Sequence, residues 1–373
     1  MINKSRLLKT FLDLININSP SKEERKAGDF VKNTLENLGF DVFEDNAGQI
    51  INGNCGNIIA SKKGNNKIAP LILNAHIDTV ESTENINVII ENSIIKTDGK
   101  TILGADDKAG VAAIIEGIHS YFESDMDFGD LQVIFTVSEE TGLEGAKNMD
   151  FSLINKDSFL FAFDSGKPVC SIVTGAPSHS TMKFEIFGKS AHAGMCPEEG
   201  INSIACASKA ISTLKFGRID HETTCNVGII SGGTKSNVVP EYTEVIIEAR
   251  SRNEEKLNIL EEKIINAFEV SAFEMNAKIK NHISREYIAF THNTSDDICQ
   301  LAIESARAVG IEPDFEISGG GFDANCFNLA GIKAAAIGTG YENVHSKEEF
   351  ISICDLEKSA EYVFALIDTM KKY

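Results

Sequence analysis

One stretch of this chain indicates its fold: Thr97-Asp98-Gly99-Lys100-Thr101-Ile102-Leu103-Gly104-Ala105-Asp106-Asp107-Lys108-Ala109-Gly110. It follows His76-Ile77-Asp78 and precedes Ser138-Glu139-Glu140, so side chains able to bind metal recur along the sequence. Each motif comes at the end of an apolar run, and an α/β sheet gathers its ligands in the loops after its strands. The sequence therefore predicts an α/β fold with a metal site at the ends of its strands.

Short apolar runs alternate with helical stretches around these motifs. Leu71–Leu73, Leu131–Val137 and Phe159–Phe163 have the composition of buried strands, and Lys108–Tyr121 is typical of a helix. This alternation predicts a mostly parallel sheet covered by helices.

Two helices are predicted before the first of these strands. The apolar residues between Leu7 and Leu14 recur at helical spacing. Ser21 with Glu24 resembles a capping box, which would open a second helix through Leu38.

A different pattern begins near Ala176. Met182, Phe184 and Ile186 alternate with charged residues, as in a strand with one buried face. The order β-α-β-β-α-β follows from this point and predicts an inserted, ferredoxin-like α+β domain that serves as a lid or dimerisation domain. We expect it over residues 177–289, inside a discontinuous catalytic domain over residues 1–176 and 290–373. The expected elements after the first strand are a helix over Ile201–Leu214, two strands around Ser231-Gly232-Gly233, a helix over Asn253–Phe273, a strand near Ala277–Ile283 and, back in the catalytic domain, a strand over Ala334–Ile337.

Length and composition narrow the class of protein. A chain of 373 residues with 42% hydrophobic residues suits two globular domains. The formal net charge of -20 argues against nucleic acid or an anionic membrane as a partner, because both require a basic surface. The 8 cysteines show no Cys-x-x-Cys spacing, which fits reduced thiols in a cytoplasmic protein. No apolar run approaches the roughly 20 residues of a membrane span, so we expect neither export nor membrane insertion.

The first two motifs supply candidate metal ligands. His76 and Asp78 stand two residues apart at a strand end, so their side chains point the same way. His76 can bind a metal while Asp78 accepts a hydrogen bond from its other ring nitrogen; an ordinary strand-end hydrogen bond is the alternative. Asp106 opens a predicted helix, where its two oxygens could bridge two cations. The alternative is that Asp106 and Asp107 only cap the helix that begins near Lys108.

Four later residues complete the candidate site. Glu139 and Glu140 follow an apolar strand and point in different directions, so one can bind metal while the other takes a proton from water. Asp164 and His345 are further ligand candidates. The alternatives are a solvated acidic turn, an aspartate in a strand-end turn and a surface histidine. Carboxylate and imidazole ligands suit two zinc ions, with manganese or cobalt as substitutes.

Together these residues resemble the peptidase T branch of the co-catalytic zinc metallopeptidases, relatives of aminoacylase and succinyl-diaminopimelate desuccinylase. The resemblance covers nearly the whole chain. The motifs that carry it are Ala75-His76-Ile77-Asp78-Thr79, Thr97–Gly110, Ser138-Glu139-Glu140, Phe163-Asp164-Ser165-Gly166 and Val344-His345-Ser346.

The resemblance implies two Zn²⁺ ions per subunit and a role for each candidate. One metal would be bound by His76 and Asp164, the other by Glu140 and His345, and Asp106 would bridge both. Asp78 would orient His76. Glu139 would be the general base that takes a proton from the attacking water and passes it to the leaving amine. The family also implies a non-proline cis peptide after Asp106.

The resemblance extends to the inserted domain. His192 would help to stabilise the tetrahedral oxyanion, and Asn237 and Arg250 would bind substrate. Arg250 suits a substrate carboxylate because its planar fork donates two hydrogen bonds. The alternatives are a packed or surface role for His192 and a solvated ladder of Glu244, Glu248 and Arg250 on one strand face. A homodimer through the inserted domain is also implied.

The chain departs from peptidase T at several points. It has Thr79-Val80-Glu81-Ser82 where that enzyme has a Ser-Pro-Asp stretch, and Ala193 instead of proline follows His192. The first domain is shorter. We therefore expect a peptidase T-like exopeptidase, or tripeptidase, that releases the N-terminal residue of short peptides. A deacylase of N-acyl amino acids and a non-catalytic metal-binding or peptide-binding protein are the alternatives.

Overall fold

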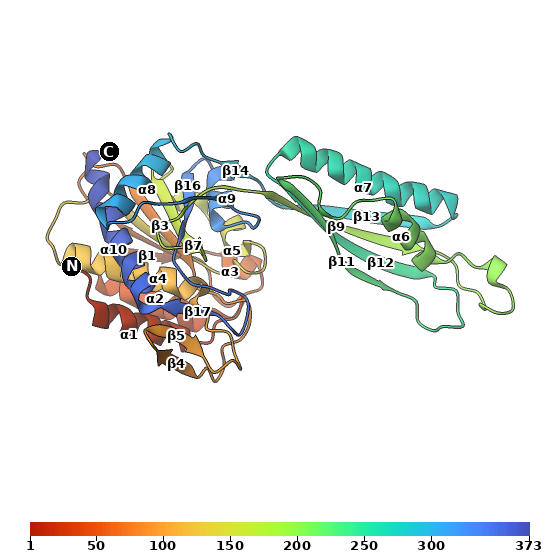
Figure 1. Ribbon diagram of the computed structural model, residues 1–373, viewed down its shortest axis with the longest axis horizontal. Coiled ribbons are helices and arrows are strands. Elements are labelled where there is room, and N and C mark those ends of the chain that lie inside the picture. The colour runs from red at the N-terminus through yellow and green to blue at the C-terminus, as the bar shows by residue number, and fades with distance from the viewer. The chain divides into compact units, whose positions relative to one another are not determined.

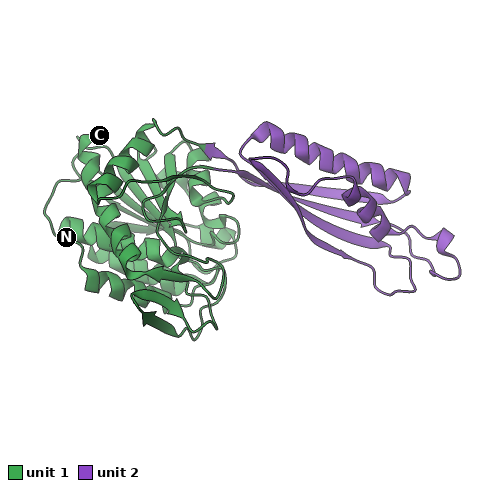
Figure 2. Ribbon diagram, in the orientation of Figure 1, with its two compact units in different colours: residues 1–175, 291–373 green, residues 176–290 purple.

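The computed structural model describes residues 1–373 and divides into two compact units (Figure 2). Unit 1 comprises Met1–Gly175 and Thr291–Tyr373, and unit 2 comprises Ala176–Phe290. Each unit has its own hydrophobic core. None of the helices combines the length and apolar character needed to cross a membrane.

Unit 1 is built on a nine-stranded mixed sheet (Figure 1), which confirms the predicted α/β class. The four central strands pair in parallel, and antiparallel strands flank them. In spatial order the strands are β1 (Asp41–Glu44), β2 (Ile58–Lys62), β6 (Leu131–Thr136), β3 (Leu71–His76), β7 (Phe159–Ser165), β16 (Lys333–Gly338), β8 (Ile172–Ala176) and β14 (Phe290–Thr291), with β15 (Phe315–Ile317) paired to β8.

The central strands β3, β6 and β7 are buried along their whole length. Parallel strands are covered on both faces, which explains why the sequences of these strands are mostly apolar instead of alternating. α4 (Ala105–Phe122) packs on β3 and β7, and α1 (Lys4–Ile15) and α10 (Ile353–Thr369) pack on α4. The other helices are α2 (Arg25–Asn37), α3 (Ala47–Ile50), α5 (Glu144–Lys147), α8 (Asp297–Ala308) and α9 (Asp323–Leu329), and a small sheet is formed by β17 (Phe350–Ser352), β5 (Ile94–Thr97) and β4 (Val88–Glu91).

The predicted capping box of the second helix is wrong. α2 begins at Arg25, and its N-cap residue, Glu24, makes no side-chain cap. The Glu24 carboxylate instead accepts a hydrogen bond from the Ser138 hydroxyl at 2.7 Å. The Ser21 hydroxyl donates to Asp78 Oδ2 at 2.7 Å. Both side chains support motifs of the candidate site instead of the helix.

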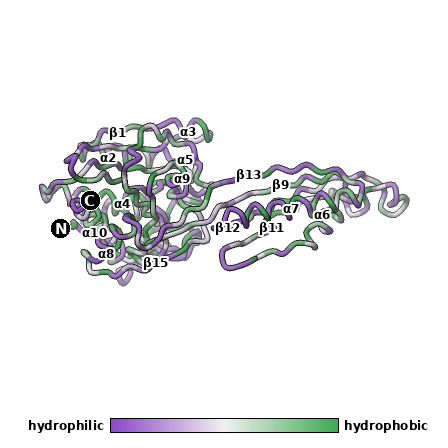
Figure 3. The backbone as a smooth tube through the Cα atoms, turned by 90° about the horizontal axis from the view of Figure 1, so that it is seen from above, coloured by the Kyte–Doolittle hydropathy of each residue, from purple (hydrophilic) through white to green (hydrophobic).

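Unit 2 contains a five-stranded antiparallel sheet with α6 (Ser203–Ser212) and α7 (Glu254–Glu274) packed on it. Hydrophilic and hydrophobic residues are interspersed along α7 (Figure 3), and the residues that it buries include Leu257, Ile264 and Phe268. Phe268 of α7 stacks on Phe184 with ring centroids 4.1 Å apart. In spatial order the strands are β10 (Gly217–Arg218), β11 (Thr223–Gly232), β12 (Tyr242–Ser251), β9 (Ser178–Phe187) and β13 (Lys278–Tyr287).

The connection between β11 and β12 is longer than the predicted turn at Ser231-Gly232-Gly233. β11 continues to Gly232 and β12 begins only at Tyr242. The residues between them pair with the segment around His192, since Ala193 N–H donates to the Asn237 carbonyl at 3.0 Å. The connection and the segment around His192 are therefore held together by backbone hydrogen bonds on the surface of unit 2.

Candidate metal centre

His76 ends β3 and is almost fully buried. Its Nε2 atom lies 3.3 Å from Asp106 Oδ1 and 3.5 Å from Asp164 Oδ1. Its Nδ1 atom lies 3.1 Å from the Asp78 carbonyl oxygen and 3.3 Å from Asp78 Oδ1. A ring nitrogen that donates to such an acceptor leaves the other nitrogen free to bind a metal. Nε2 of His76 therefore faces the carboxylates as a potential ligand.

The sequence left open whether Asp106 faces metal or only caps the helix together with Asp107, and in the structure the two carboxylates have different contacts. The peptide bond between them is cis, as the resemblance implied, and both residues have non-helical backbone angles. Asp107 accepts hydrogen bonds from the N–H groups of Gly110 and His76, at 3.2 and 3.3 Å, so it caps the regular part of α4. The Asp106 carboxylate instead reaches towards two histidines, with Oδ2 3.4 Å from His345 Nε2.

Glu140 and His345 form the other side of the cluster. Glu140 Oε2 lies 3.0 Å from His345 Nε2. Glu140 Oε1 is buried and has no hydrogen-bond partner. The His345 side chain is 50% exposed, on a loop whose backbone at this residue has φ 59°. The cluster is thus open to solvent on the His345 side.

Asp78 fixes the motif that carries the two glutamates. It is fully buried. Its Oδ1 accepts the Glu139 N–H at 3.0 Å, and its Oδ2 accepts the Glu140 N–H at 3.3 Å. The same carboxylate therefore orients His76 at the end of β3 and the backbone that follows β6.

Buried acidic groups crowd around His76. Burial raises the pKa of the Asp164 carboxyl to about 7. Burial and the nearby charge of Asp164 raise the pKa of the Glu139 carboxyl well above its usual range. Although burial opposes it, the hydrogen bonds from His345 and His76 hold the pKa of Asp106 below its usual range. Like charges gathered in a buried place require a compensating positive charge.

The donor set fits divalent cations. Potential ligand atoms of His76, Asp106 and Glu140 lie within 4.8 Å of one another, as do those of His76, Asp107 and Asp164. Because both oxygens of Asp107 already accept backbone N–H groups, Asp106 is the better ligand of the two. Zinc and similar ions bind such a mixture of imidazole and carboxylate donors. The buried Glu140 Oε1 atom, which has no hydrogen-bond partner, is available as one of these donors.

Comparison with known proteins identifies the group to which this site belongs. Residues 72–369 match Peptidase family M20/M25/M40. The chain belongs to this family. It is 40% identical over 372 residues to the uncharacterized protein YqjE of Bacillus subtilis, covering 100% of both chains. Crystal structures of a tripeptidase from Staphylococcus aureus (35% identity, TM-score 0.96, 100% of both chains) and of aminopeptidase PepT from Bacillus cereus (36% identity, TM-score 0.92, 99% of both chains) are similar to it.

Membership of the M20 family confirms the resemblance to peptidase T-like enzymes and makes the protein a peptidase, and so a hydrolase that acts on peptides. Peptidases of this family depend on metal ions, in agreement with the donor cluster. The roles of the individual residues stay predictions.

Two acidic residues of this M20 peptidase's site were not predicted from the sequence. Asp323, which begins α9, is buried and accepts a hydrogen bond from the Thr136 hydroxyl, and burial raises its pKa to about 6. Glu349 is buried and lies on the same loop as His345. The glycine-rich loop Ser318–Gly321 could have pointed to Asp323, which follows it. Nothing in the sequence distinguishes Glu349 from its exposed neighbour Glu348.

The three predicted substrate-binding residues lie in unit 2. His192 is exposed and lies just before a turn, and its Nδ1 accepts the N–H groups of Gly194 and Met195, both at 3.2 Å. Asn237 is its neighbour through the backbone pairing of the two segments. On β12, Arg250 Nη2 lies 3.0 Å from Glu248 Oε2, whereas Glu244 pairs with Lys183 at 2.7 Å. Of the ladder that was the alternative to a substrate-binding Arg250, the pair of Glu248 and Arg250 is present, whereas Glu244 pairs with Lys183.

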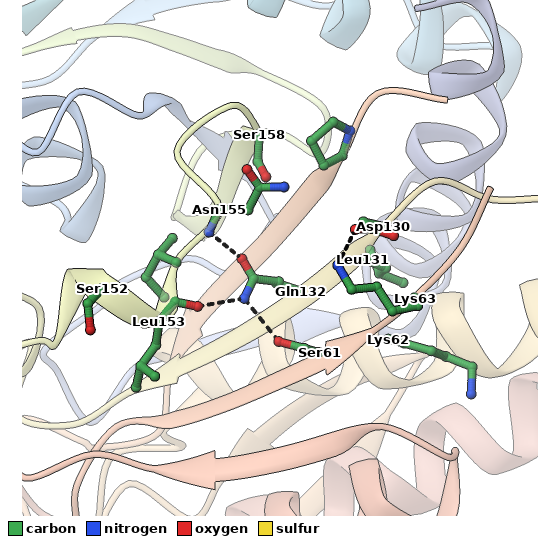
Figure 4. Close-up of a pocket in the computed structure, with 12 residues that line it drawn as sticks. Ser61, Lys62, Lys63, Asp130, Leu131, Gln132, Ser152, Leu153, Asn155 and Ser158 are labelled. Atoms are coloured by element: carbon green, nitrogen blue, oxygen red, sulfur yellow. Dashed lines mark hydrogen bonds and ion pairs between the residues drawn. The ribbon is translucent and has the colours of Figure 1, made fainter. Parts of the chain in front are cut away.

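A hollow of about 360 Å³ lies at the opposite edge of the unit 1 sheet, at the amino ends of the parallel strands (Figure 4). The Gln132 amide at its base donates to Ser61 and to the Leu153 carbonyl, both at 3.0 Å, and accepts the Asn155 N–H at 2.9 Å. These polar groups satisfy one another, so the hollow offers no catalytic set comparable to the metal centre.

Proposed function

We propose that this protein is a zinc-dependent exopeptidase that removes the N-terminal residue from short peptides, as a tripeptidase or related aminopeptidase. The observation that carries the proposal is the cluster of His76, Asp106, Asp164, Glu140 and His345 at the ends of the central strands. Similarity to a tripeptidase and to PepT over the full chain supports the substrate class.

The cluster would hold two cations. His76 and Asp164 would bind one, Glu140 and His345 the other, and Asp106 would lie between them, since its two oxygens face different histidines. A bound zinc pair supplies Lewis acidity, which polarises a carbonyl and lowers the pKa of water towards neutrality. Cobalt or manganese would serve as substitutes.

Glu139 would act as the general base. Its backbone is fixed by Asp78, and it is not needed as a ligand in the proposed set. Because burial and the Asp164 charge raise the pKa of its carboxyl, Glu139 can take a proton from water and hold it until the amine leaves. General catalysis of this kind contributes about 10²- to 10⁴-fold to a rate.

His192 would donate a hydrogen bond to the developing oxyanion. Its Nδ1 is an acceptor for two backbone N–H groups, so a neutral ring carries its proton on Nε2. That tautomer presents an N–H donor of the kind that stabilises a tetrahedral oxyanion. Asn237 and Arg250 would bind the remainder of the substrate, with Arg250 on its carboxylate.

Unit 2 would also mediate a homodimer. Beyond its short pairing with β10, β11 has an open edge, and Ile229 and Ile230 on it are 52% and 50% exposed. An unpaired strand edge with apolar side chains is suited to pair with a second copy.

The test compares a free tripeptide with its N-acetylated twin, using zinc-loaded protein and mass spectrometry of the products. We expect release of the first residue from the free peptide only. Glu139→Gln should lose turnover and keep its metal. Cleavage of the acetylated twin alone would make the protein a deacylase. If wild type bound zinc but cleaved neither peptide, this result would contradict the proposed exopeptidase function.

A further inference from the structure

Glu349 makes an unusual set of contacts for a loop glutamate. It is 1% exposed, and its carboxylate accepts three backbone N–H groups. Oε2 accepts those of Leu103 and Gly104, at 2.9 and 2.7 Å, and Oε1 accepts that of Asp106 at 2.9 Å. All three donors come from a segment more than two hundred residues away in sequence.

The three N–H groups belong to the turn that opens α4. Its N-cap residue, Gly104, has a left-handed backbone with φ 71° and no side chain to cap the helix. Asp106 itself is non-helical, so the ordinary ladder of helix hydrogen bonds does not fix it. A buried N–H group requires an acceptor, and within this turn Glu349 supplies it.

We propose that Glu349 is a positioning residue that holds the carboxylate of Asp106 between the two metal sites. The inference rests on the proposed function, in which Asp106 binds both cations. The loop that carries Glu349 also carries His345, whose Nε2 lies 3.4 Å from Asp106 Oδ2. One loop therefore braces the backbone of Asp106 and places a second ligand against its side chain.

The chain offers a matched pair of substitutions. Glu349→Gln is nearly isosteric but has one acceptor oxygen, so its NH₂ group would face an N–H group that now bonds to Oε1 or Oε2. Glu348→Gln removes the same charge from the adjacent residue, which is exposed and makes no side-chain hydrogen bond to this turn. His345→Ala removes a proposed direct ligand. Its zinc affinity provides the reference value for the loss of one metal site.

The experiment measures zinc content and affinity of the full-length protein by competition with a chromophoric chelator. Glu349→Gln should weaken zinc binding by about 10- to 100-fold, the range for outer partners of metal ligands. Its kcat should fall with KM nearly unchanged, and far-UV circular dichroism of the apo protein should match wild type. Glu348→Gln should behave as wild type. Wild-type zinc affinity in Glu349→Gln would overturn the proposal.

Hydrogen exchange of metal-free wild type provides a second arm that does not depend on folding of the variant. The amides of Leu103, Gly104 and Asp106 should be protected before metal is added, because Glu349 already accepts their N–H groups. Exchange at the rate of an unstructured peptide would overturn the proposal. If wild type bound no zinc while these amides were protected, the proposed function would fail and the brace would stand.

Discussion

Asp78 contacts several residues of the candidate metal site but has no place in the proposed set of ligands. It accepts hydrogen bonds from Ser21, Glu139 and Glu140 and lies beside Nδ1 of His76. Asp78→Asn keeps the shape and removes one acceptor oxygen. We expect zinc affinity or kcat/KM to fall by about 10- to 100-fold, because such partners orient metal ligands. Steady-state kinetics and zinc titration measure this, with the exposed Asp127→Asn as control. An unchanged Asp78→Asn enzyme would contradict the role.

The tautomer of His192 yields a second prediction at this scale. The amide nitrogen of a glutamine side chain can occupy the place of Nε2, whereas that of asparagine corresponds to Nδ1. If Nε2–H is the oxyanion donor, His192→Asn should lower kcat by about 10²- to 10³-fold, as for loss of an oxyanion donor, and His192→Gln should retain more activity. The reverse order, measured by steady-state kinetics, would reject the Nε2 assignment.

The cysteines differ sharply in accessibility. Burial raises the pKa of Cys55, Cys170 and Cys326 to about 12, and that of Cys225 and Cys299 to about 11. Thiolates are the reactive form. Iodoacetamide at pH 8 should therefore modify the exposed Cys354 and the partly exposed Cys196 first. Peptide mapping by mass spectrometry checks this, with all 8 modified in denaturant. Early labelling of Cys170 or Cys326 in the native protein would contradict the described burial.

At the scale of elements, α4 and α10 approach each other closely at Gly117. A Cβ atom placed there would lie 2.5 Å from Val363 Cβ. Alanine favours a helix over glycine by about 1 kcal/mol, but overpacking a core costs about 1–3 kcal/mol. Gly117→Ala should therefore lower the free energy of unfolding. Gly228→Ala, where the nearest atom would be 3.8 Å away, is the control in denaturant titration. A stabilised Gly117→Ala protein would show that α10 shifts freely.

The elements that the sequence predicted well are those governed by local pattern. β3, β6 and β7 were placed from continuous apolar runs, and β9 from alternation, because burial on two faces or on one leaves these patterns directly. The capping box failed because Ser21 and Glu24 have tertiary partners, Asp78 and Ser138. The contacts of Glu349 were also beyond prediction, since its hydrogen-bond donors are remote in sequence.

The whole molecule contains two cores, and all of the candidate metal ligands belong to unit 1. In the proposed function zinc is bound by unit 1, so its removal would leave crowded carboxylates in that unit only. At a zinc concentration of 1,000 Kd, bound metal stabilises a protein by about 4 kcal/mol. Excess chelator should therefore lower the melting temperature of unit 1 and leave that of unit 2 unchanged. Thermal unfolding followed by limited proteolysis and mass spectrometry separates the two. Equal decreases in the melting temperatures of both units would contradict the prediction that metal stabilises unit 1 alone.

The chain leaves the unit 1 sheet along β8 and returns along β14, the next strand in that sheet. The first and last strands of unit 2 also run side by side, with His179 opposite Tyr287. The insertion therefore occupies the place of a connecting turn. Evolution could exchange this insertion, or a protein engineer could replace it, while the strands of unit 1 that lead to the candidate metal ligands keep their order. Substrate preference and hydrolytic chemistry would then be separately inherited traits of one polypeptide.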